Sequence, residues 1–298
     1  MGFQFVHFGA FSRKGNKQGQ STDFVFGEAE RRPNASLHVS NPAPPEVVFG
    51  LAVSEVRALH DERAADAKDI MKNGRSRAIR STQMTLATVI ASHPLTVEEV
   101  RADPAKAAEV KEWERRTVEW LQSQFGDQLV SVVRHVDERH CHLHSYILPA
   151  NGMMKAVEIH PGHVAKAAVM AEGPRFGEDD KALNKRGDKA YRAVMRQWQD
   201  DYYQNVGAPC GLTRIGPQVR RLKRAEWQAE TQAAQALKNS LAEAATVDAK
   251  RDEFVKKTKQ DAGKFVEQTK IKAAAIHAAA DLEKQVSMPD EISPEVPK

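Results

Sequence analysis

Residues able to bind a metal gather in one short stretch, RHVDERHCHLHSYILP, which runs from Arg134 to Pro149. Four of the chain's 11 histidines lie here, at positions 135, 140, 142 and 144, together with Asp137 and Glu138. Neutral imidazoles bind first-row divalent metals, and three of them leave coordination positions open for water or a phosphate oxygen. The stretch is therefore a candidate catalytic metal site.

The elements that must position these side chains are two adjacent strands. The runs LVSVVRHV and HCHLHSYILP are strand-like and are separated by the polar residues DER, which is typical of a hairpin. Residues two apart on a strand share a face, so His142 and His144 project side by side while Leu143 points toward the core. The turn brings His135 back near His142. Since His140 has the same parity as His142, it stays open as an alternative third ligand.

Two carboxylates of the same stretch have a supporting part in this prediction. Asp137 and Glu138 can each accept a hydrogen bond from the non-ligating N–H of an imidazole, which fixes its tautomer. A solvated hairpin whose histidines cluster by accident is the alternative. Leu143, an apolar residue flanked by histidines on a β run, argues against it.

The rest of the chain predicts an α+β fold, with an antiparallel central sheet and flanking helices. Strands are expected at QFVHFGAF and at Met84 to Pro94, and FVFGEAER is expected to form a short helix in an otherwise loop-like segment from Phe24 to Gly50. Helices are expected from Ser54 to Gly74, on both sides of Pro104 up to Gly126, and over KRGDKAYRAVMRQWQDDYYQNVG. A loop is expected between the hairpin that follows Gly126 and the last of these helices.

A change of composition follows. Leu222 to Gln285 is rich in Ala, Glu, Lys and Gln, which predicts a long, coiled-coil-like helical extension. We expect domains at 1–215 and 216–286 and a disordered tail at 287–298.

Charge and cysteine content set weaker limits. The 44 basic and 40 acidic residues give a net charge of +4, a mild preference for an anionic partner. No apolar run is long enough to cross a membrane, and MGFQFVHFGAFSRKG lacks the apolar core of a secretory signal, so we expect a cytoplasmic protein without membrane insertion whose two cysteines are reduced.

The motif HVDERHCHLH has the form H-x-D-E-x-x-x-H-x-H and resembles the metal motif of the mobilization relaxases of the plasmid recombination (Pre/Mob, or MobV) family, within the HUH endonucleases. RSRAIRSTQMTLATVIASHP and KALNKRGDKAYRAVMRQWQDDYYQNVGAPCGLTR resemble the family's flanking segments in the same order. The sequence departs from the family at Cys141, where proline is usual.

The resemblance implies a metal site and a reaction. It implies that His135, His142 and His144 bind a divalent metal, Mn²⁺ or Mg²⁺, with Asp137 and Glu138 around them and His140 outside the ligand set. It also implies a relaxase that nicks one strand of origin-of-transfer DNA, keeps the 5′ phosphate covalently bound, and rejoins the ends.

The resemblance leaves the attacking residue open. The family often has a histidine in a pattern like H-N-x-R, and this chain has Glu28-Ala29-Glu30-Arg31 in the corresponding place, so Glu28 is the predicted nucleophile and Arg31 matches. His7 and His38 are alternatives. So are Tyr202 and Tyr203, which follow the metal motif as in replication initiators, whereas Tyr146 suits a hydrogen-bond donor near the ligands.

Basic residues suggest where DNA would bind. The predicted contacts are Arg31, Arg75, Arg77, Arg80, Arg220 and Arg221. The extension is expected to contact the transfer machinery or a second copy of the chain. Two rival functions stay open: a rolling-circle replication initiator with a catalytic tyrosine, and a non-catalytic DNA-binding accessory protein.

Overall fold

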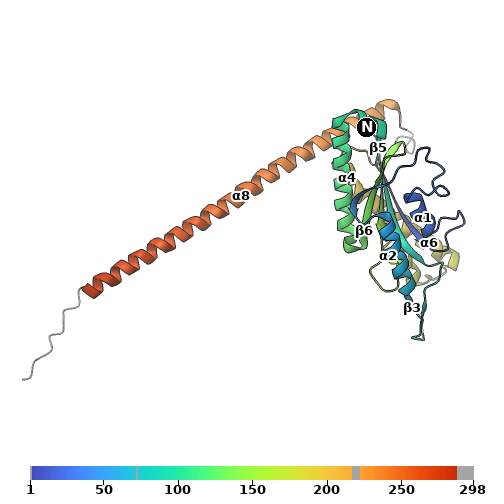
Figure 1. The fold of residues 1–298 in the computed structure, drawn as a ribbon, viewed down its shortest axis with the longest axis horizontal. Coiled ribbons are helices and arrows are strands. Elements are labelled where there is room, and N and C mark those ends of the chain that lie inside the picture. Colours follow the sequence, from blue (N-terminus) through green and yellow to red (C-terminus); the bar gives the residue numbers. More distant parts are fainter. Residues whose placement is uncertain (1, 72, 217–221, 287–298) are drawn as a thin grey trace, which may run out of the picture. The chain divides into compact units, whose positions relative to one another are not determined.

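A computed structural model describes residues 2–71, 73–216 and 222–286, and it shows the predicted α+β architecture (Figure 1). Five antiparallel strands form one sheet in the order β1-β5-β7-β6-β2. The strands are β1 Phe5–Ser12, β2 Glu46–Gly50, β5 Met84–Thr96, β6 Leu129–His135 and β7 His140–Ile147. A separate hairpin pairs β3 Lys68–Ile70 with β4 Ser76–Ala78. The predicted fold class is confirmed.

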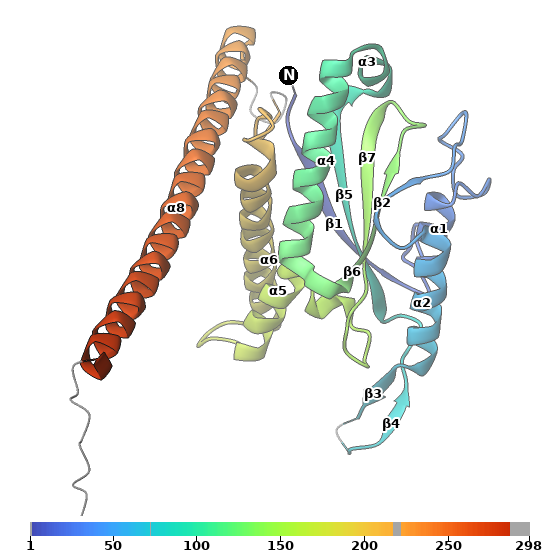
Figure 2. The same cartoon turned by 60° about the vertical axis from the view of Figure 1, so that its left-hand side comes forward.

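Helices cover both faces of this sheet (Figure 2). They are α1 Thr22–Ala29, α2 Val53–Asp66, α3 Val97–Ala102, α4 Pro104–Phe125, α5 Pro161–Glu172 and α6 Asp180–Tyr202, with short turns η1 Gly126–Gln128, η2 Ala156–Glu158 and η3 Tyr203–Gly207. Helices α4 and α6 pack Trp113, Trp198 and Tyr202 against one face, in the larger core. Helices α1 and α2 pack Phe26 and Val56 against the other, beside Tyr146.

The predicted break at Pro104 is confirmed. Thr96 caps α3 by accepting from the Glu99 amide, and Asp103 caps α4 by accepting from the Ala105 amide. Proline is well suited to the first turn of a helix, because the N–H that it lacks would have no helical partner there. At the other end of α4, Gly126 adopts a φ of 51°, which glycine accepts without strain.

Three local expectations were wrong. The helix expected from Ser54 to Gly74 ends at Asp66, because Ala67 turns extended and the chain enters the β3–β4 hairpin. Strand β2 lies in the segment expected to be loop, where its pairing with β6 replaces local periodicity. Helix α5 lies in another expected loop, capped by the His160 side chain and begun by Pro161.

The predicted C-terminal helix is present as α8, Arg224–Val286. The chain divides into two compact units, Met1–Asn239 and Ser240–Lys298. The first turns of α8 thus belong to the first unit, where Ala234 is buried. The boundary expected at 215 remains a prediction, and the tail at 287–298 lies outside the described residues. No helix among the described residues is long and apolar enough to cross a membrane.

Candidate metal centre and its carboxylate network

The β6–β7 pairing brings the three predicted ligands together. His135 lies directly opposite His142, and His144 lies opposite Val133 on β6 and Ile90 on β5. Ring centroids are 4.7 Å apart for His135 and His144 and 6.5 Å apart for His142 and His144. All three imidazoles therefore project from the sheet face that α1 and α2 cover.

Two of these histidines are buried in the form that binds metals. His135 is 1% exposed, and neither of its ring nitrogens has a hydrogen-bond partner. Burial lowers the pKa of His135 to about 4 and that of His144 to about 3, so both imidazoles are neutral at neutral pH. Buried polar atoms normally have partners, and two unpaired nitrogens on one buried ring fit a missing ligand. These residues thus fit a bound divalent metal.

The residues between the histidines hold β7 in place. Leu143 and Cys141 are buried in the larger core on the opposite face of the sheet. This is the arrangement that the alternation of β7 predicted. The ligands consequently stand on a strand whose other face is fixed by packing.

Arg31 organises the carboxylates around the histidines. Its side chain is 4% exposed, and it donates from Nε and Nη2 to the two carboxylate oxygens of Asp137, at 2.8 and 2.7 Å. It also donates to Glu138 Oε1 at 2.9 Å and to Glu28 Oε1 at 3.2 Å. Its φ of 57° is a left-handed conformation that few non-glycine residues adopt, so the surrounding contacts must hold it there.

This network bears on the roles expected for two residues. Arg31 was predicted to contact DNA, and that contact stays a prediction; in the structure its donors bind three carboxylates in a buried position. Asp137 was expected to orient a ligand imidazole, but its Oδ1 lies 3.9 Å from His135 Nδ1, beyond a hydrogen bond. Asp137 accepts from Arg31 and from the Ala43 amide.

Glu138 does contact a predicted ligand. Its Oε2 lies 3.2 Å from His142 Nε2. The hydrogen bond with His142 and the contact with Arg31 lower the pKa of Glu138 to about 2, so this carboxylate stays charged at neutral pH.

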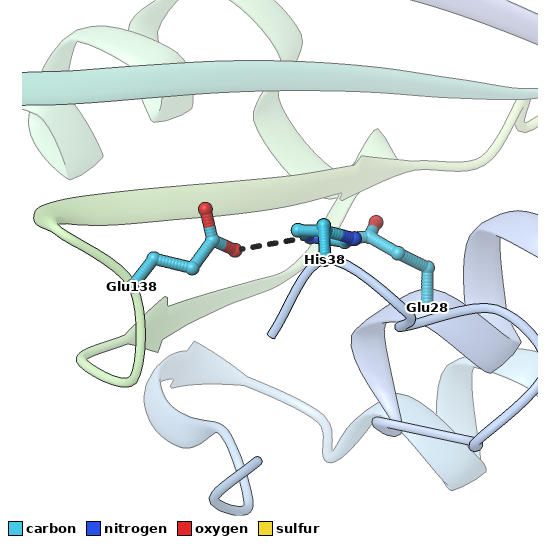
Figure 3. A group of neighbouring side chains, drawn as sticks. All are labelled: Glu28, His38 and Glu138. Carbon is cyan, nitrogen blue, oxygen red and sulfur yellow. Dashed lines mark ion pairs between the residues drawn. The ribbon is translucent and has the colours of Figure 1, made fainter. Parts of the chain in front are cut away.

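One histidine outside the sheet reaches the same carboxylates. His38 Nε2 lies 3.6 Å from Glu138 Oε1 and 3.9 Å from Glu28 Oε1 (Figure 3). Ligand atoms of Glu28, His38 and Glu138 all lie within 4.8 Å of one another, closely enough for a cation. Because the Arg31 guanidinium already binds both carboxylates, we favour the histidine triad as the metal site. The sequence offered no spacing signal that would have singled out His38.

The sheet separates the other nucleophile candidates from the triad. Tyr202 is buried in the core of the opposite face, where its hydroxyl accepts from Trp113 Nε1 at 2.9 Å. Tyr203 follows it in η3, and the Tyr191 hydroxyl lies 3.3 Å from His160 Nε2, a ring that packs on Phe8 of that same core. None of these three tyrosines lies on the histidine face.

Two candidates share the histidine face. His7 is exposed on β1, in register with Ile90 and therefore two strands away from His144. Tyr146 is buried beside Phe26, and its hydroxyl has no hydrogen-bond partner. His140, the alternative third ligand, contacts a different group: its Nδ1 lies 3.3 Å from the Leu95 carbonyl oxygen.

An apolar hollow of about 410 Å³ adjoins the triad. Its walls come from the N-terminal segment and from β5 and β7, and its lining residues are Phe3, Phe5, Ser92, His93, Pro94, His140 and His142. Phe5 is 48% exposed and sits in the same cross-strand row as His142. Exposed aromatic side chains thus lie beside His142, the predicted ligand that lines this hollow.

The remaining predicted DNA contacts lie elsewhere. Arg75 and Arg80 are exposed on and after the β3–β4 hairpin, and Arg77 pairs with Asp69 at 2.8 Å. Arg220 and Arg221 lie outside the described residues.

No protein-family model and no curated protein matches this sequence. The structure is similar to the Mn-bound MobM relaxase domain (MOBV; Mob_Pre) bound to plasmid pMV158 oriT DNA, with 14% identity, a TM-score of 0.32, and coverage of 59% of this chain and 88% of that one. It is also similar to the conjugative relaxase TrwC in complex with oriT DNA, with 15% identity, a TM-score of 0.26, and coverage of 80% and 99%. We draw the function from the side chains of the site.

Proposed function

We propose that the protein is a plasmid-mobilization relaxase, which nicks and rejoins one DNA strand at an origin of transfer through a covalent protein–DNA intermediate. The observation that carries the proposal is the triad of His135, His142 and His144, with two unpartnered nitrogens on buried His135 and a charged carboxylate network beside it. Three imidazoles suit an open, catalytic metal site.

The chain's own residues supply position and charge. A divalent ion such as Mn²⁺ or Mg²⁺, when bound, would polarise a phosphate and stabilise the negative charge that develops on it. Arg31 fixes Glu138 and Asp137, and Glu138 in turn holds His142, so the most exposed ligand is oriented from behind.

Single-stranded DNA is the substrate that the surroundings favour. Bases stack on exposed aromatic rings, and Phe3 and Phe5 offer such rings beside His142. Arg75 and Arg80 on the β3–β4 hairpin would contact phosphates. Glu28 and His38 adjoin the triad and are the candidates to attack the scissile phosphate.

A rolling-circle initiator is disfavoured by the placement of the tyrosines. Such an enzyme would use a tyrosine on a helix after the metal motif, and Tyr191, Tyr202 and Tyr203 lie on the side of the sheet away from the histidines. A tyrosine there would have to cross the sheet to reach a phosphate bound at the triad.

Self-association is our proposal for the helix beyond Asn239. Phe254, Phe265 and Ile276 recur every 11 residues along α8, and each is 69% exposed. Eleven residues make about three helical turns, so these side chains form one stripe that another copy of the helix would cover.

The function is tested with the purified protein, Mn²⁺ and labelled single-stranded oligonucleotides tiling the DNA that flanks its own gene. We expect a covalent protein–DNA adduct on one of them, which EDTA and His144→Gln abolish. An accessory protein without catalysis would bind the DNA without forming an adduct. Absence of an adduct with Mn²⁺, Mg²⁺, Zn²⁺ and Co²⁺ alike would overturn the proposal.

A further inference from the structure

We propose that His38 is the nucleophile that attacks the scissile phosphodiester, with Glu28 and Glu138 orienting its imidazole. This inference rests on the proposed relaxase function and names the residue that the sequence left open. It also moves the attack away from Glu28, the residue in the family's nucleophile position.

His38 is placed beside the triad by its own loop. The Ser36 hydroxyl donates to the Glu28 carbonyl at 3.3 Å, and the Val39 amide donates to the Ser36 carbonyl at 3.0 Å. Val39 is buried, whereas the His38 side chain is 52% exposed. A turn closed by Val39 and anchored to the end of α1 through Ser36 therefore holds an imidazole that solvent, and a DNA strand, can reach.

A single carboxylate joins His38 to the metal site. Glu138 presents Oε1 to His38 Nε2 at 3.6 Å and Oε2 to His142 Nε2 at 3.2 Å. Only the carboxylate of Glu138 would thus separate His38 from a phosphate held at the triad next to His142. His7, by comparison, stands two strands from His144 on the same face.

The two carboxylates also suit the chemistry of an attacking imidazole. Nε2 of His38 faces the carboxylates of Glu28 and Glu138. The tautomer that carries its proton on Nε2 leaves the lone pair of Nδ1 free to attack. Nδ1 forms a bond to phosphorus as the bond from phosphorus to the 3′ oxygen breaks. The Nε2 proton passes through a carboxylate to the departing 3′ oxygen, which leaves as a hydroxyl, and the phosphoramidate keeps one negative charge on its phosphate oxygens beside a neutral imidazole ring.

Glu28 is better placed to orient than to attack. Its Oε1 accepts from Arg31 at 3.2 Å, which withdraws electron density from the carboxylate. Burial raises the pKa of Glu28 despite that contact, so this carboxylate accepts the released proton readily. A glutamyl nucleophile would give an acyl phosphate, a linkage of different stability.

The linkage itself distinguishes the candidates. The wild-type adduct, formed with Mn²⁺ on the reactive oligonucleotide, is exposed separately to mild acid and to alkali, and its peptide is mapped by mass spectrometry. A phosphohistidine bond is lost in acid and survives alkali. Alkali cleaves an acyl phosphate, and a phosphotyrosine bond resists both acid and alkali.

Three variants accompany this test. His38→Gln is expected to lose the adduct while it binds Mn²⁺ and melts as the wild type does. Glu28→Gln is expected to form the adduct more slowly but with the same acid-labile bond. His7→Gln, an exposed histidine on the same sheet face, is the matched control and should form the adduct normally.

The outcomes separate the inference from the function on which it rests. An acid-labile adduct mapped to His38 and absent from His38→Gln supports the inference. An adduct that alkali cleaves, that maps to another residue, or that persists in His38→Gln overturns it while the relaxase function stands. Loss of Mn²⁺ binding in His38→Gln would make His38 a ligand and also overturn it. No wild-type adduct at all would overturn the function.

Discussion

One buried arginine holds three carboxylates at the candidate site. Arg31 binds Asp137 through two nitrogens and reaches Glu138 and Glu28 as well, from a left-handed backbone conformation. Removing a buried charge partner leaves the others uncompensated, which costs more than the pair contributes. The candidate metal site therefore depends on a residue whose own donors are occupied by carboxylates.

Replacing Arg31 should consequently destabilise the folded protein strongly. We expect Arg31→Ala to lower the free energy of unfolding by about 3–5 kcal/mol, measured by urea denaturation. The neighbouring Arg32, half-exposed in its pairs with Asp23 and Glu30, is the matched control, and Arg32→Ala should cost about 1 kcal/mol or less. Equal costs for the two variants would refute the central role of Arg31.

Buried neutral histidines also make stability depend on pH. Burial lowers the pKa of His144 from 6.5 to about 3. Between these two pH values the unfolded chain therefore binds a proton at His144, whereas the folded, metal-free protein does not. The contribution of His144 to the free energy of unfolding is complete above about pH 6.5. It falls as the pH drops toward the pKa that His144 has in the folded protein, by up to about 1.4 kcal/mol per pH unit for one proton.

The contribution of His144 can be isolated with His144→Gln. We expect the urea midpoint of the metal-free variant to fall less steeply between about pH 6 and about pH 4 than that of the wild type. Carboxylates that titrate in this range are common to both proteins and cancel in the comparison. Parallel curves would show that His144 is not buried in its neutral form.

A cross-strand row through β1, β5 and β7 links the hollow to the candidate metal site. Phe5, Ser92 and His142 are cross-strand neighbours, so an exposed ring stands two strands from a ligand. A base stacked on an aromatic side chain contributes about 1–3 kcal/mol. The sheet thus presents an exposed aromatic ring and the predicted ligands on one face.

Phe5→Ala should therefore weaken the binding of single-stranded DNA. We expect the loss of about 1–3 kcal/mol of binding free energy, measured by fluorescence anisotropy with a labelled oligonucleotide in EDTA. Phe176→Ala, a fully exposed phenylalanine outside this row, should bind as the wild type does. Unchanged affinity in Phe5→Ala would exclude stacking at this hollow.

At the scale of the whole molecule, the first turns of α8 complete the first compact unit. Ala234 is buried, Lys238 lies 4.0 Å from Glu109 on α4, and Gly211 packs near Lys238. These turns of α8 line a pocket together with Thr213 and Tyr203. Removing them would therefore expose those two residues to solvent.

Two truncations test where the folded unit ends. We expect a chain of residues 1–239 to melt cooperatively and form the adduct at the wild-type rate, since it keeps the whole first unit. A chain ending at 215, the boundary expected from composition, should melt at a lower temperature. Equal melting temperatures would instead place the end of the folded unit at residue 215. Sedimentation of both truncated chains would report any loss of self-association.

The sequence by itself determined much of the local order. Alternation set His142 and His144 on one face of β7 and Leu143 on the other, Pro104 divided α3 from α4, and the Ala- and Lys-rich segment specified a long helix. These features depend on periodicity and on side chains close together in the chain, so one sequence is enough to reveal them.

Only the tertiary structure decided which distant residues meet. Arg31 and Asp137 are 106 positions apart, and neither residue type reveals that the two form a buried pair. His38 reaches Glu138 because its loop folds back over the end of α1, and the tyrosines of α6 and η3 lie beyond the sheet because that helix packs on its other face. Long-range packing makes these contacts, and local propensity carries no information about it.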